Sequence, residues 1–193
     1  MHDSAPGIDS YGLRMRVGSN TKKVVKVAFT SGPGLSAPTD FAANDYRGNG
    51  GEFQWETPKT AAIPTIGGVY TVDVTTDDGV TCSQTMTVTN VLTGVPTAVS
   101  PSGSGGTKPT FMWLAPAPAP SAFFYALDIS VQGPATSPIW QYQMPSSALS
   151  VLYDVDGSSG ASALTSGTTY SWSISALDPL GNEARSSTTF TVP

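Results

Sequence analysis

The segment DVDGSS, residues 154–159, contains the residues of this chain whose type and spacing best suit metal binding. Asp154 and Asp156 stand two positions apart before Gly157. Their carboxylates could contribute oxygen ligands to calcium, a hard cation that binds several oxygens. A helix–loop–helix calcium loop also needs a third Asp or Asn and a late Glu, which this segment lacks. Because Asp and Gly are common turn residues, an ordinary turn is the simpler interpretation and calcium the alternative.

Three aromatic residues form a second candidate site. Trp140 and Tyr142 alternate on one face of a strand expected within residues 137–144, and Phe124 is expected to point outward nearby. Rings that were exposed and coplanar there could stack on sugar rings, although core packing is the simpler role. The other tryptophans are in phase with core positions and are assigned to packing: Trp55, Trp113 and Trp172.

Few side chains in the sequence suit catalysis. The chain has one histidine and one cysteine, whereas a zinc site needs three or four ligands. A catalytic triad would have to use His2, in an N-terminal segment expected to fray. Cys82 is in phase with Met86 and Val88, which predicts a buried thiol of low reactivity. The sequence therefore predicts a protein that is not an enzyme and needs no cofactor.

Charge limits the partners that this chain is expected to bind. The net charge is −5, and only 12% of the residues are charged. Nucleic acid and anionic membranes both attract cationic surfaces, so neither is expected as a partner. No apolar run approaches the roughly 18 residues of a membrane-spanning helix. The basic residues near the N-terminus are interpreted as an outward strand face: Arg14, Arg16, Lys22, Lys23 and Lys26.

Alternating apolar and polar residues indicate strands throughout the chain, and no segment favours a long helix. One such run predicts that Val25, Val27 and Phe29 face a core. The clearest hairpin spans residues 69–89, with a turn at 77–79 in which Asp78 and Gly79 are both expected to have positive φ.

A turn-rich segment, residues 90–109, separates the two halves of the chain and places a boundary near Gly94 and Val95. Within it, GSGGTK at residues 103–108 superficially resembles a phosphate-binding loop. A strand follows where that motif requires a helix, so a flexible linker is expected instead. The halves, 1–94 and 95–193, each match the size of a small β-sandwich.

The last thirty residues resemble the final two strands of a fibronectin type III domain, in the form common in bacterial secreted and surface proteins. The resemblance rests on Leu164, Gly167, Thr168 and Tyr170, followed by WSISALD and a Gly-Asn turn. It extends over about residues 95–193 and implies a β-sandwich with no particular activity. It also implies a tyrosine corner, in which Tyr170 binds backbone groups near Leu164. Residues 67–89 more weakly resemble bacterial immunoglobulin-like or polycystic-kidney-disease-like repeats.

These observations predict an all-β chain of two tandem immunoglobulin-like and fibronectin type III-like β-sandwiches. The resemblance implies an extracellular or cell-surface location. The expected role is a non-catalytic spacer, or a surface for neighbouring domains, surface proteins or polysaccharide. The alternative is a carbohydrate-binding module that uses Phe124, Trp140 and Tyr142.

Overall fold

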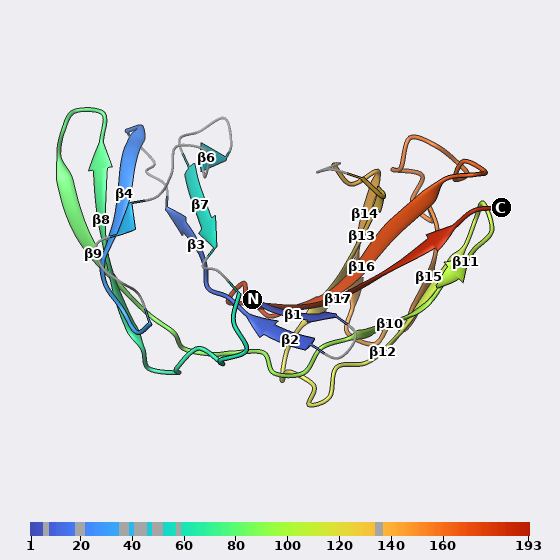
Figure 1. The fold of residues 1–193 in the computed structure, drawn as a ribbon, viewed down its shortest axis with the longest axis horizontal. Helices are drawn as coiled ribbons and strands as arrows, with labels where there is room; N and C mark the ends of the chain where they lie inside the picture. Colours follow the sequence, from blue (N-terminus) through green and yellow to red (C-terminus); the bar gives the residue numbers. More distant parts are fainter. Residues whose placement is uncertain are drawn as a thin grey trace. The chain divides into compact units, whose positions relative to one another are not determined.

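The computed structural model describes residues 1–5, 8–17, 22–34, 39–40, 46–47, 52–56, 59–133 and 137–193. Within these residues the chain is all-β, without a helix, as predicted (Figure 1). Accordingly, none of the described segments is a helix long and apolar enough to cross a membrane. The chain forms two compact units by its internal contacts. One contains residues 10–91, and the other, here called the C-terminal unit, contains residues 1–9 and 92–193.

The C-terminal unit consists of two β-sheets. The larger sheet has the order β14 (Trp140–Pro145), β13 (Phe124–Val131), β16 (Thr169–Leu177), β17 (Glu183–Thr191), β1 (His2–Ala5) and β2 (Ile8–Tyr11), with β11 (Gly103–Ser104) also paired to β17. The smaller sheet has the order β10 (Thr97–Ser100), β12 (Thr110–Leu114) and β15 (Ser150–Leu152). The two sheets form separate layers of this unit in Figure 1.

The core of the C-terminal unit follows from the two-residue period of its strands. Along β12 and β13 every second residue is buried, because successive side chains point to opposite faces. Trp113 and Trp172 are both buried in this core, which confirms their assignment to packing. Phe111 of β12 packs edge-to-face against Trp172 of β16, with ring centroids 5.0 Å apart. This contact joins one sheet to the other.

The predicted tyrosine corner is present at the start of β16. The backbone N–H of Thr165 donates to the hydroxyl of Tyr170 over 3.0 Å. Leu164 and Tyr170 are both buried, and the Tyr170 ring stacks on Phe190. Gly167, between them, has φ of 75°, a left-handed conformation that glycine adopts without steric cost. The hydroxyl therefore ties the segment before β16 to the core.

The two predicted hairpin turns share one construction. In each, the N–H of the first residue of a five-residue segment donates to the carbonyl oxygen of the last. The pairs are Thr76 with Val80 (2.9 Å) and Asp178 with Asn182 (3.0 Å). Gly79 and Gly181 have φ of 80° and 82°. Asp78 does not have the positive φ that was expected. The reason is loop length, because a three-residue loop combines an ordinary turn with one left-handed glycine.

The N-terminal strand corrects two expectations. His2 was expected to lie in a frayed segment of the first half, but it is 1% exposed and its Nδ1 lies 3.1 Å from the carbonyl oxygen of Leu92. Strand β1 runs parallel to β17, with His2 opposite Ala184 and Ser4 opposite Ser186. Residues 1–9 thus belong with 92–193 rather than with 10–91. By pairing with β17, strand β1 provides hydrogen-bond partners for backbone groups of β17 that would otherwise lie at an open edge of the sheet.

The glycine-rich segment after β10 is also structured, so the expected flexible linker is wrong here. Gly103 and Ser104 pair in parallel with Phe190 and Thr191, and the N–H of Gly105 donates to the Thr191 carbonyl. A Cβ on Gly105 would lie 2.6 Å from the Phe190 ring. Glycine is required because the backbone runs against this ring.

The unit of residues 10–91 also contains two sheets. One has the order β5 (Thr39–Asp40), β4 (Val24–Ser31), β8 (Val69–Thr76) and β9 (Thr81–Thr87). The other has the order β3 (Arg14–Val17), β7 (Glu52–Glu56) and β6 (Tyr46–Arg47). The core of this unit comprises five buried residues: Val24, Val27, Phe29, Tyr70 and Val72. Leu13 and Val17 are partly buried and pack against them. The side chains of Trp55, Arg14 and Arg16 lie outside the description, so their predicted roles are not addressed.

Strand β4 departs from the alternation predicted for it. Val27 and Phe29 are buried as expected, but Val24 is buried and Val25 is exposed. The pairing of β4 with β8 shifts register between Val24 and Lys26. A β-bulge of this kind adds one residue to a strand and reverses the face of the residues before it.

We expect Tyr170→Phe to lower the free energy of unfolding by about 1–2 kcal/mol, because the N–H of Thr165 loses its partner while the ring stays in place. The control is Tyr153→Phe. The Tyr153 hydroxyl is buried and makes no hydrogen bond within the described part of the chain, so its removal should cost little. Urea denaturation followed by tryptophan fluorescence measures both, and equal losses would contradict the role of the corner.

Candidate functional site

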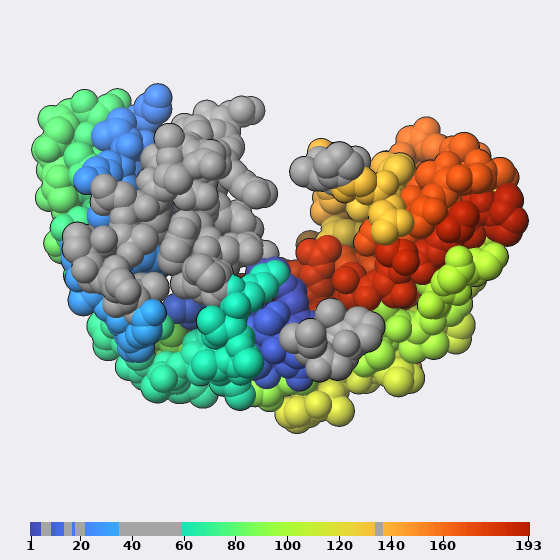
Figure 2. Space-filling model, in the orientation of Figure 1, coloured from blue at the N-terminus to red at the C-terminus, as the bar shows by residue number. Residues whose placement is uncertain are grey.

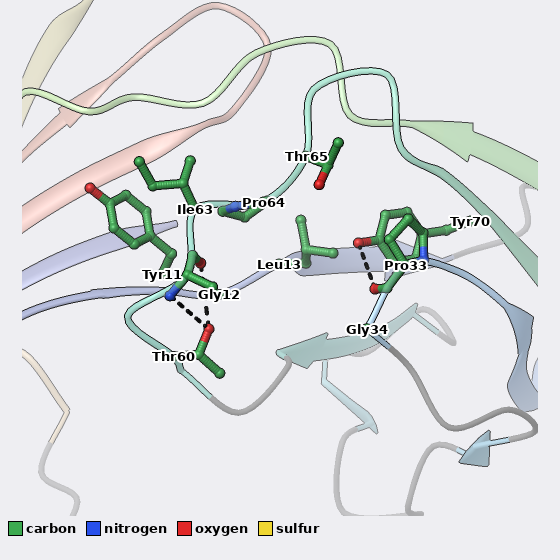
Figure 3. Close-up of a pocket in the computed structure, with 11 residues that line it drawn as sticks. Tyr11, Gly12, Leu13, Pro33, Gly34, Thr60, Ile63, Pro64, Thr65 and Tyr70 are labelled. Carbon is green, nitrogen blue, oxygen red and sulfur yellow. Dashed lines mark hydrogen bonds between the residues drawn. The ribbon is translucent and has the colours of Figure 1, made fainter.

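A pocket of about 470 Å³ lies within the unit of residues 10–91 (Figure 3). Its volume is in the range of small-ligand sites. Three chain segments form its walls: residues 11–13, residues 33–34 and the loop 60–65, together with Tyr70. The complete lining is Tyr11, Gly12, Leu13, Pro33, Gly34, Thr60, Ala62, Ile63, Pro64, Thr65 and Tyr70.

Backbone hydrogen bonds hold the pocket segments in place. The N–H of Tyr11 donates to the carbonyl of Thr60 over 2.7 Å, and the N–H of Thr60 donates to the carbonyl of Tyr11 over 3.0 Å. On the other side, the Tyr70 hydroxyl donates to the carbonyl of Pro33 over 3.2 Å, as Figure 3 shows. Burial raises the pKa of Tyr70, so the hydroxyl stays protonated and keeps this bond at physiological pH. The pocket is therefore preformed, because these hydrogen bonds within the protein position its lining segments.

The chemistry of the pocket is apolar contact with a few hydroxyl groups. Leu13, Ile63 and two prolines provide the apolar walls, and Thr60 and Thr65 provide hydroxyls. Ile63 is 53% exposed, so its side chain is accessible to a ligand. None of the described lining residues carries a carboxylate, an imidazole or a thiol. Such a lining suits binding of an apolar group.

Sequence analysis did not identify this pocket. Its residues come from segments separated by twenty or more positions, and each segment resembles an ordinary strand end or loop. The two proline-containing loops, GPG at 32–34 and AIPTIGG at 62–68, are the only local signal. Both contain an exposed turn beside a strand, which alone does not distinguish a binding loop from any other.

Trp140 is part of the core, which is the simpler of the two roles considered for it and excludes it from an exposed platform. The side chain is 2% exposed and packs edge-to-face against Tyr153. Its Nε1 donates to the Asp156 carboxylate over 2.9 Å. Strand register explains the burial, because Trp140 stands opposite Ile129, whose side chain points into the core.

Tyr142 and Phe124 do not complete a common surface either. Tyr142 stacks on Trp140 with ring centroids 5.5 Å apart and planes 13° from parallel, and it is partly buried. Phe124 is also partly buried and stands opposite Pro145 and Leu177. It neighbours the inward-pointing Tyr125 and so faces the other side of the sheet. The structure thus brings Trp140 and Tyr142 together and leaves Phe124 apart.

Asp154 and Asp156 close a turn with their carboxylates. Asp154 accepts a hydrogen bond from the N–H of Ser159 over 2.9 Å. Asp156 accepts hydrogen bonds from the hydroxyl of Ser158 and from the indole of Trp140. These hydrogen bonds, led by the Ser158 hydroxyl, lower the pKa of Asp156. No group of three or more His, Cys, Asp or Glu residues suited to a metal occurs in the described ranges.

Cys82 is exposed, contrary to the expectation of a buried thiol. The predicted face is the observed one, since Cys82 pairs with Val74 and Met86 with Tyr70. However, β9 is the last strand of its sheet, and nearly all its residues are exposed. The alternation of apolar and polar residues predicts which side chains lie on the same face of a sheet. It does not predict whether another part of the protein covers that face at an edge strand.

The basic residues 22–26 behave as a solvent-facing group. Lys22 forms an ion pair with Asp78 in the β8–β9 turn, while Lys23 and Lys26 are exposed. Asp78 also accepts a hydrogen bond from the Thr76 hydroxyl. The Lys22 ammonium group, with this hydroxyl, lowers the pKa of Asp78 from 3.8 to about 2. The pair fixes the turn and forms no anion-binding pocket with its described neighbours.

Comparisons with known proteins add little to this geometry. No protein-family model matches the chain. No curated protein matches it either. Among solved structures it is similar to the FN1–FN3 domains of chicken CNTN1, with 14% identity and a TM-score of 0.30. That match covers 90% of this chain and 58% of the other, so the chain spans less than two thirds of that structure. The architecture of the C-terminal unit is therefore defined by its own strand order, a larger β-sheet and a three-stranded β-sheet.

We expect the Lys22–Asp78 pair to stabilise the fold above pH 3.8 and to lose this effect as the pH falls through about 2. The sign follows because the pKa in the folded chain lies below that in the unfolded chain. Both groups are exposed, so the effect should be small and should weaken with salt. An NMR titration of the Asp78 carboxyl should show a higher midpoint in Lys22→Met and an unchanged one in the control Lys23→Met.

We expect EDTA to leave the melting temperature unchanged, because the oxygens of Asp154 and Asp156 already accept protein hydrogen bonds. Differential scanning calorimetry with and without EDTA, followed by calcium addition, measures this. A fall in melting temperature that calcium reverses would instead support the calcium site at DVDGSS.

Proposed function

We propose that this chain is a non-catalytic β-sandwich module of a secreted or cell-surface protein, made of two tandem sandwiches. In this role it separates neighbouring domains and presents a surface to a protein partner. The observation that supports the proposal best is the composition of the pocket in residues 10–91. Its described lining offers aliphatic, proline and tyrosine surface with two threonine hydroxyls, and no acid–base pair.

An extended peptide segment with one bulky apolar side chain is the ligand that this lining suits. Leu13 and Ile63 would contact the apolar side chain, and the hydroxyl of Thr65 could bind a peptide carbonyl or N–H. The fixed positions of Tyr11 and Tyr70 favour binding, because a preformed site loses little conformational entropy when the ligand enters.

Carbohydrate binding is the alternative proposal. It would depend on Tyr142 or Phe124 separately, since both rings are partly exposed and they lie on opposite faces of their sheet. A single ring offers less stacking surface than a platform of three. We therefore favour the peptide ligand.

We expect a panel of extended peptides, each with one bulky apolar residue, to include ligands that shift the amide NMR signals of Leu13, Ile63 and Thr65. Ile63→Asp should weaken such binding at least about tenfold, because it removes apolar contact and buries a charge. Ile66→Asp is the matched control. Ile66 is 63% exposed in the same loop but does not line the pocket, so affinity should not change.

Two results would contradict the proposal. One is an absence of shifts at the pocket with every peptide, and the other is an equal loss of affinity in both variants. A soluble polysaccharide that shifts Tyr142 or Phe124 and leaves the pocket signals unchanged would favour the alternative.

A further inference from the structure

The smaller sheet of the C-terminal unit has an apolar outer face. Four large apolar side chains on it are 46–61% exposed: Val99, Met112, Leu114 and Leu152. We call these four residues the β12 face. In Figure 2 the segment that contains β10 and β12, coloured yellow-green, lies at the surface of this unit.

Strand register places the four side chains on one side of the sheet. Met112 and Leu114 alternate with the buried Phe111 and Trp113, so they point away from the core. Leu152 stands opposite Thr110, which is also outward. The pairing of β10 with β12 shifts register between Ala98 and Ser100. The extra residue is Val99, which lies beside Met112, because a bulge sets two residues opposite one.

The four side chains of the β12 face do not belong to the hydrophobic core of the C-terminal unit. Phe111, Trp113 and Val151 already fill the inner side of this sheet. Solvent-exposed strand faces usually carry polar side chains, so four large apolar ones need another explanation. From their exposed fractions the four residues together expose roughly 400 Å², the size of the largest apolar patch on a typical monomer (about 300–600 Å²), which is often functional.

Charge and area favour a second copy of this chain as the occupant. The three strands read TAVS, TFMWL and SVL, with no charged residue in any of them. Two such faces can meet without opposing like charges, although the whole chain carries −5. A standard interface buries about 800 Å² on each partner, of which about 57%, or roughly 450 Å², is apolar. The β12 face alone supplies nearly this amount.

We propose that two copies of the chain pair through their β12 faces, sheet against sheet, about a two-fold axis. Such an arrangement is isologous, so each copy contributes the same four side chains and no further surface is required. Face-to-face packing of sheets about 10 Å apart is the usual geometry of β-sandwich interiors. The β12 face and the pocket lie in different units, so this proposal and the proposed peptide-binding role can fail independently.

Sedimentation velocity of the full chain over a range of concentrations tests the pairing. Wild type should shift from monomer to dimer with a dissociation constant in the micromolar range or below. Leu114→Glu and Leu152→Glu should each weaken the dimer at least about tenfold, because each would bury a carboxylate in an apolar interface. Circular dichroism should show that both variants fold, since both positions are exposed.

Leu180→Glu is the matched control. Leu180 is 69% exposed in the β16–β17 turn, outside the β12 face, and its replacement should leave the dimer unchanged. A second measurement places Met112→Cys in a Cys82→Ser background, where a short bis-maleimide should crosslink the two copies through the central strand β12. Wild type that stays monomeric at every concentration would overturn the proposal, as would an equal effect of Leu180→Glu or the absence of crosslinking at Met112→Cys.

Discussion

The C-terminal unit depends on two interactions of the Trp172 side chain, a hydrogen bond and a ring contact. Its Nε1 donates to the carbonyl of Pro101 over 2.9 Å, and its ring packs on Phe111 of the opposite sheet. A buried indole N–H usually pairs with an acceptor, and here the pairing holds the backbone at Pro101 against the core. The contact with Phe111 depends on the register of β12. A slip of one residue in β12 would bury Met112 and expose Phe111.

Local patterns in the sequence were sufficient for several features that depend on neighbours along the chain. Alternation predicted the inward positions of Trp113 and Trp172, and the family resemblance around Leu164 and Tyr170 implied the tyrosine corner. The glycine positions predicted both hairpins. The corner and the two turns act within a few residues of the strands that they stabilise.

Local patterns failed where a distant segment decides the outcome. Parallel pairing of β1 with β17 joins His2 to Ala184, and no local signal in either strand specifies that partner. A surface platform stayed open as an alternative for Trp140, because the cover provided by Tyr153 and Asp156 comes from another segment. The candidate pocket has the same origin, since its walls meet only after three separate segments fold together.

The parallel β1 strand has a consequence for the way the chain is connected. Because residues 1–9 and 92–193 belong to one unit, residues 10–91 are joined to it by two covalent crossings, at 9–10 and at 91–92. A protease that cuts at either crossing leaves the other intact. Both cuts, or one cut and the loss of the β1–β17 hydrogen bonds, are needed before a fragment can leave, a redundancy that single-linker tandem domains lack.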